Sequence, residues 1–88
     1  MSKFQAGQVV MTPGAAEAVP EAVMITALAR HLNGHWGDVC KEDKAANNLA
    51  LRDGGRLFSA YHAPDGTKFW IITEADRSAT TILLPDDY

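Results

Sequence analysis

Hydrophobic and polar positions in the carboxy-terminal half follow the pattern of three β-strands. The runs are Arg56–His62, Lys68–Glu74 and Ala79–Leu84, and the second and third are rich in β-branched or aromatic residues. Four small or charged residues, Ala75–Ser78, separate the second run from the third, as in a tight connection between strands. The pattern therefore predicts an antiparallel meander of three strands.

The segment Ala63-Pro64-Asp65-Gly66 predicts how the first two strands pair. Proline presets φ at the second position of a turn, and glycine accepts the left-handed position of a bulged three-residue hairpin. A strand alternates its faces, so this turn fixes the pairs on both sides of the hairpin. The expected pairs are Arg56–Glu74, Phe58–Ile72 and Ala60–Trp70 on one face, and Leu57–Thr73, Ser59–Ile71 and Tyr61–Phe69 on the other.

Three helices are predicted before the strands, over residues 15–19, 20–32 and 39–51, from apolar spacings of three and four and from helix-start signals. Thr12 can cap the first helix, because Pro13 suits a first helical position. Asp38 can cap the third helix. His31 falls in the last turn of the second helix, where a cation is favoured by the helix dipole.

These elements predict an α+β fold and a single domain over residues 1–88, since a chain of this length is too short for two cores. The sheet is expected to be antiparallel, with three strands and Gln8–Met11 as a candidate fourth. Two or three amino-terminal helices should pack on the face that carries Tyr61, Phe69, Ile71, Ile82 and Leu84. The last strand should leave an exposed edge at Thr80–Leu84, available for pairing with another chain.

Composition narrows the function classes. Eight Lys and Arg are scattered among eleven Asp and Glu, for a net charge of −3, which argues against a nucleic-acid partner. A single cysteine, Cys40, excludes an internal disulfide and fits a reducing compartment. No apolar run approaches the roughly 20 residues of a membrane span, and Met1–Phe4 does not begin a signal peptide. We therefore expect a cytoplasmic protein without a membrane partner.

Candidate catalytic and metal-binding residues are few. His31, His35, Asp38 and Cys40 form the cluster that most resembles a set of metal ligands, but their spacing is irregular and Asn33-Gly34 ends the helix between the histidines. The residues around Cys40 match no pattern of a cysteine nucleophile. The expectation is a protein that is not an enzyme and holds no metal or cofactor, with a small metal protein as an alternative.

One face of the predicted hairpin is a candidate interaction surface. Its centre is apolar and its frame, formed by Arg56, His62, Lys68 and Glu74, is charged, as in many protein interfaces. The turn after it presents either a recognition loop or a purely structural Asx-type turn. Trp36 is either a plug of the core or an exposed anchor. The candidate residues are Trp36, Phe58, Trp70, Ile72, Glu74, Asp76, Arg77 and Ser78. The alternative is that the amino-terminal strand or short helix covers this face.

Several segments resemble a family of small bacterial proteins found on plasmids, prophages and other mobile elements. Some members carry labels such as plasmid-related protein or restriction–modification subunit. The segments are Trp36–Asp38, Asp43–Asn47, Arg56–Tyr61, Trp70–Ser78 and Thr80–Pro85, together with Tyr88. The resemblance implies an accessory role on a mobile element.

The leading functional hypothesis is a non-catalytic protein–protein interaction module. It includes self-association, through the carboxy-terminal strand or through the face that carries Trp70. The alternatives are an anti-defence inhibitor of the anti-restriction or anti-CRISPR type, and a small metal-binding or nucleic-acid-associated protein.

Overall fold

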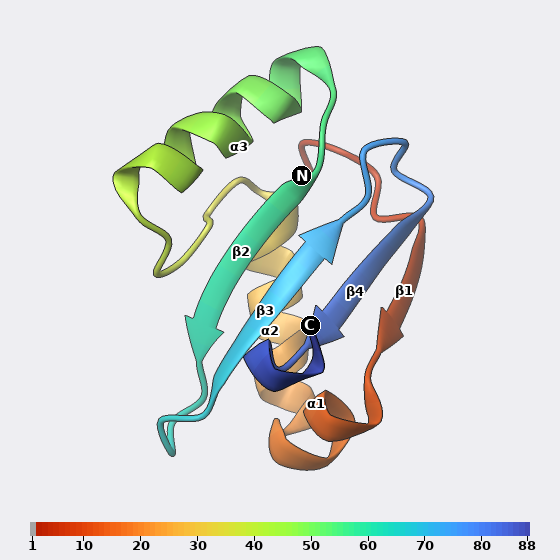
Figure 1. Cartoon of the computed structure of the whole chain (residues 1–88). Helices are drawn as coiled ribbons and strands as arrows, with labels where there is room; N and C mark the ends of the chain where they lie inside the picture. The colour runs from red at the N-terminus through yellow and green to blue at the C-terminus, as the bar shows by residue number, and fades with distance from the viewer. Residues whose placement is uncertain (1) are drawn as a thin grey trace.

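The computed structural model describes residues 2–88 and shows an α+β fold with a four-stranded sheet and three α-helices (Figure 1). The strand order is β1-β4-β3-β2. Within the described part of the chain, no helix has the length and apolar character needed to cross a membrane. In chain order the elements are β1 (Gln8–Met11), α1 (Pro13–Ala18), α2 (Glu21–Leu32), α3 (Lys41–Asp53), β2 (Leu57–His62), β3 (Lys68–Thr73), β4 (Ala79–Leu83) and the 3-10 helix η1 (Pro85–Asp87).

The hairpin of β2 and β3 has the register predicted from its turn. The two strands are antiparallel, and Ala60 lies opposite Trp70. The turn closes where the Ala63 backbone N–H donates to the Thr67 carbonyl over 2.8 Å. Gly66 has φ of +91°, the left-handed conformation that favours glycine. The predicted pairing of β2 with β3 is thus confirmed.

The sheet is mixed, and the prediction of a wholly antiparallel sheet is wrong. β1 pairs in parallel with β4, with Gln8 beside Ala79 and Met11 beside Ile82. The expected free edge at Thr80–Leu84 is also wrong, because β4 lies between β3 and β1. A short apolar run indicates a strand but carries no information on its direction or on a neighbour almost a whole chain away. The sheet therefore ends at β1 and β2.

Helices α1 and α2 contribute to the main apolar core. Thr12 caps α1 as predicted, since its hydroxyl accepts a hydrogen bond from the Ala15 N–H over 3.2 Å, and Pro13 occupies the first turn. α2 begins directly after Pro20. The buried residues of this core are Ala15, Val19, Met24, Ala27, Tyr61, Phe69, Ile71 and Ile82. Burial of each large side chain among them stabilises the fold by about 1.5–3 kcal/mol.

The β2 edge is covered by α3 and by the loop that precedes it (Figure 1). Asn47 of α3 hydrogen-bonds the backbone N–H and carbonyl of Phe58. Two residues further along β2, the Ala60 N–H donates to the Trp36 carbonyl over 3.1 Å and the Ala60 carbonyl accepts from the Asp38 N–H over 2.7 Å. The outward backbone groups of Phe58 and Ala60 are therefore satisfied without a further strand.

His31 lies inside the protein rather than at the surface of the last turn of α2. Its side chain is fully buried, Nδ1 lies 2.5 Å from the Ser59 hydroxyl and Nε2 lies 2.8 Å from the Thr73 hydroxyl. The Thr73 hydroxyl in turn lies 2.8 Å from the hydroxyl of Thr80. Burial, and next the nearby charge of Arg77, lower the pKa of His31 to about 4. This polar network joins α2 to three strands.

Candidate functional site

One face of the sheet carries an aromatic cluster, which we call the Trp70 face: Phe58, Ala60, Trp70, Ile72, Thr81, Leu83 and Tyr88. In Figure 1, α2 passes behind the sheet and η1 lies in front of it, over this face. The Trp70 ring meets Phe58 at 5.1 Å and Tyr88 at 5.9 Å between centroids, both edge to face. Phe58 and Trp70 remain half-buried, whereas their cross-strand neighbours Ile72 and Leu83 are buried.

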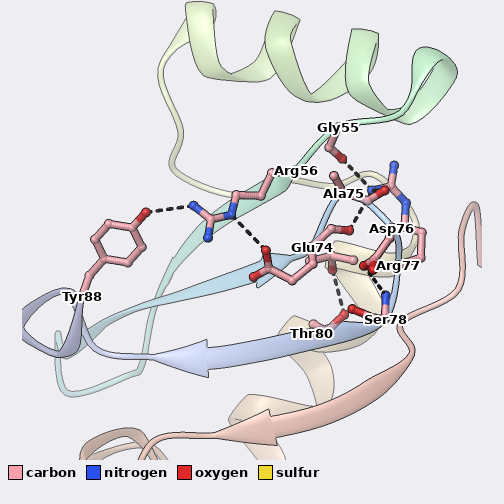
Figure 2. Close-up of polar contacts among 10 residues, drawn as sticks. Gly55, Arg56, Glu74, Ala75, Asp76, Arg77, Ser78, Thr80 and Tyr88 are labelled. Atoms are coloured by element: carbon pink, nitrogen blue, oxygen red, sulfur yellow. Dashed lines mark hydrogen bonds and ion pairs between the residues drawn. The ribbon is translucent and has the colours of Figure 1, made fainter.

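The charged pair of Arg56 and Glu74 borders one end of the Trp70 face, and Figure 2 shows both side chains with Tyr88. The Arg56 Nε lies 3.5 Å from a Glu74 carboxylate oxygen, and Arg56 Nη1 donates to the Tyr88 hydroxyl over 2.9 Å. The hydrogen bond to Tyr88, and next the charge of Glu74, raise the pKa of Arg56 above its ordinary value. Arg56 therefore holds the tyrosine ring against Trp70 while its own side chain stays exposed.

A hollow of about 320 Å³ lies at the other end of the Trp70 face, lined in part by Ala60, Trp70 and Pro85. Its titratable lining includes Asp38, His62 and Lys68. The Asp38 carboxylate lies 2.5 Å from His62 Nδ1, which fixes the imidazole at the rim of the hollow. This contact corrects the prediction that Asp38 caps the third helix: α3 begins at Lys41, after Cys40, and has no side-chain cap.

The turn from β3 to β4 presents Asp76 and Ser78 to solvent. The Ser78 N–H donates to the Asp76 carboxylate over 3.0 Å, which is the geometry of an Asx-type turn (Figure 2). Hydrogen bonds from Ser78 keep the pKa of Asp76 below its ordinary value. The Asp76 side chain is thus engaged within the turn.

Arg77, between these two residues, is directed inward. Its guanidinium donates to the backbone carbonyls of Gly55 at 2.5 Å, Glu74 at 3.1 Å and Ala50 at 3.1 Å (Figure 2). Its φ of +62° is left-handed, which is unusual for a residue with a side chain. The side chain therefore fastens the turn to the end of α3 and to the segment that leads into β2.

Trp36 does not belong to the Trp70 face, because its side chain is only 3% exposed. The indole Nε1 donates to the Asn48 side chain over 3.1 Å, and the ring packs against Phe4 and against the edge of His31. Of the two interpretations of the sequence, the core plug is the one that agrees with this burial. A bulky aromatic residue there fills the space between the amino-terminal segment, α2 and α3.

The residues that resembled metal ligands are dispersed. His31 is buried in its hydroxyl network, Asp38 contacts His62, and Cys40 is exposed as a free thiol. Within residues 2–88, no group of three or more His, Cys, Asp or Glu side chains is placed to hold a metal ion. The chemistry present at the Trp70 face is that of aromatic packing and ion pairing.

The structural roles of two buried polar residues, His31 and Asn47, were not predicted from the sequence. Ser59, Thr73 and Thr80 were the available signal for His31, since they place polar groups on the otherwise apolar core face. Asparagine has a low helix propensity, so the presence of Asn47 within a predicted helix indicated that its side chain makes a tertiary contact.

Comparisons with protein-family models, with curated proteins and with solved structures found no match.

Proposed function

We propose that this protein is a non-catalytic binding module that contacts a protein partner through the Trp70 face. The observation that supports this proposal most directly is the half-buried pair of Phe58 and Trp70 on the sheet face opposite the α1–α2 core. Aromatic side chains dominate the centres of protein interfaces, because their burial displaces much water at a small cost in conformational entropy.

The borders of the Trp70 face favour a partner surface that has apolar side chains at its centre and charged groups around them. Arg56 and Glu74 offer one charge of each sign at one end, and Lys68 and Asp38 do so at the other. The hollow beside Trp70 has room for one apolar side chain of the partner. A polar rim of this kind contributes more to specificity and orientation than to affinity.

The resemblance to mobile-element proteins favours a bacterial defence component as the partner. Under this proposal the module acts in the cytoplasm, where restriction–modification and CRISPR components operate, and it inhibits or redirects one of them. The net charge of −3 supports a protein partner over nucleic acid, which would repel the chain.

The test is affinity capture from cells that carry defined restriction–modification and CRISPR systems, with quantitative mass spectrometry. The Ala60→Arg variant places a long charged side chain beside Trp70 and removes no aromatic contact. The matched control is Ala29→Arg on the exposed side of α2. We expect a defence component to bind the native chain and the control but not Ala60→Arg, and to do so again when purified. Equal capture by all three chains would contradict the proposal.

A further inference from the structure

The free edge of β1 carries several of the large exposed hydrophobic side chains found in residues 2–88. Six large hydrophobic side chains are substantially exposed within residues 2–88, and four of them lie at this edge. Val9, Val10 and Met11 of β1 are 41%, 37% and 45% exposed, and Ile25 on the neighbouring turn of α2 is 61% exposed. A groove between β1 and α2 brings Val9, Met11 and Ile25 together.

The backbone of β1 presents unpaired groups at the same edge. The Gln8 N–H donates to the Ser78 carbonyl over 3.0 Å and the Thr12 N–H donates to the Ile82 carbonyl over 3.0 Å, so these residues face β4. Backbone groups alternate along a strand, and the N–H and carbonyl of Val9 and Met11 therefore point outward.

The two edges of the sheet differ in whether the outward backbone groups have hydrogen-bond partners. At β2, Asn47 and the loop before α3 satisfy the outward backbone groups. At β1, the sequence Gln-Val-Val-Met has no charged residue or proline, which are the residues that commonly prevent pairing of an edge strand. The β1 edge is thus suited to accept a further strand.

We propose that β1 pairs antiparallel with β1 of a second copy of this chain, around a two-fold axis at Val10. This register is self-complementary: Val9 of each copy lies opposite Met11 of the other, and each of these two pairs exchanges an N–H···O bond in both directions. Val10 faces Val10 as the closer, non-hydrogen-bonded pair. Two four-stranded sheets then form one continuous sheet.

The charge distribution favours a second copy over a charged peptide. The strand is neutral, and Glu21 is the one charged residue among those lining the groove. Neutral apolar edges attract one another where a basic or acidic segment would find no counter-charge. Ile25 extends the apolar contact from the strand to the helix layer. The contact is still small beside the roughly 20–30 residues per side of a standard interface, so the dimer should be weak and concentration-dependent.

Sedimentation equilibrium over a wide concentration range tests this dimer. We expect reversible dimerisation of the native chain, and weakening by about tenfold or more in Val10→Lys, which places two like charges face to face. The control Leu49→Lys places the same charge at another exposed apolar position, on α3, and should dimerise like the native chain. Circular dichroism verifies that both variants fold. A monomer at every concentration, or a dimer unaffected by Val10→Lys, would overturn the proposal.

A disulfide tests the position of the two-fold axis. In a Cys40→Ser background, Val10→Cys should form a covalent dimer on mild oxidation, because opposed residues of a non-hydrogen-bonded pair lie about 4.5 Å apart at Cα, within the range of a disulfide. Leu49→Cys in the same background is the matched control and should cross-link much more slowly. Equal rates for the two variants would show that Val10 does not lie at the axis and would refute the register.

Discussion

Asn47 binds the backbone of Phe58 through both polar atoms of its side-chain amide. Its Nδ2 donates to the Phe58 carbonyl over 2.6 Å, and its Oδ1 accepts from the Phe58 N–H over 3.0 Å. These are the two hydrogen bonds that a neighbouring strand would supply, and here one helical side chain makes both. The sheet therefore ends at β2 by means of a specific residue.

Replacing Asn47 with alanine should lower the free energy of unfolding by about 1–3 kcal/mol, because a partly buried backbone donor and acceptor lose their partners. The higher helix propensity of alanine offsets a small part of this loss. Asn48→Ala is the control: it removes one acceptor from Trp36 at an exposed position, and its effect should be smaller. Urea denaturation measures both, and equal midpoints for the two variants would contradict the edge-capping role.

Stability should fall as the pH decreases through the range in which His31 is protonated only in the unfolded chain. The pKa of this group is about 4 in the folded protein and about 6.5 when unfolded, so the unfolded state binds more protons between these values. The stabilisation is complete above pH 6.5 and decreases until about pH 4, by roughly 3 kcal/mol in total.

The control for this pH dependence is the exposed histidine His35. Urea denaturation at a series of pH values should give the same decrease between pH 6.5 and pH 4 for His35→Gln as for the native chain. His31→Gln should be less stable at pH 7 and should lack most of this decrease. A native chain whose stability is constant over this range would show that His31 is accessible to protons in the folded state.

Arg77 contributes both hydrogen bonds and an unfavourable backbone conformation, which two substitutions separate. Arg77→Ala should destabilise the fold by about 1.5–3 kcal/mol, because a charged donor to several carbonyls is lost. Arg77→Gly should destabilise it by about 1 kcal/mol less, since glycine adopts a φ of +62° without strain. Thermal unfolding of the pair measures the difference, and a glycine variant less stable than the alanine variant would contradict this account.

Tyr88 should shield Trp70 from solvent. The tyrosine is 71% exposed, so Tyr88→Ala should change the free energy of unfolding by less than about 1 kcal/mol, yet it should increase quenching of tryptophan fluorescence by acrylamide. Tyr88→Phe retains the ring and loses the hydrogen bond from Arg56, and it should give an intermediate result. Quenching that is identical in all three chains would show that the ring does not cover Trp70.

Local features of the fold could be predicted from the sequence because a few adjacent residues determine them. Pro64-Asp65-Gly66 fixed the hairpin register, and Thr12-Pro13 fixed the start of α1. The direction of β1 could not be predicted, because its partner Ala79–Leu83 lies at the opposite end of the chain.

The part of the candidate site that lies on the hairpin could be predicted, because side chains alternate between the two faces of a strand. Trp70 and Phe58 share a face because strand geometry places them there. Trp36 and Arg77 are different, since their side chains are satisfied by Asn48 and by the carbonyls of Gly55 and Ala50, all contributed by a separate region of the fold. Such tertiary contacts leave no local pattern.

The parallel pairing of β1 with β4 has a consequence for biosynthesis. β1 is synthesised before its neighbour Ala79–Leu83, and α1, α2, α3, β2 and β3 all lie between the two strands in the chain. The hairpin β2–β3 can form through contacts between nearby residues, whereas β1 must wait until Ala79–Leu83 has been synthesised. We expect the apolar residues of β1 to remain without their native neighbour while these intervening elements are synthesised, so β1 is exposed to chaperones and to misassembly during that interval.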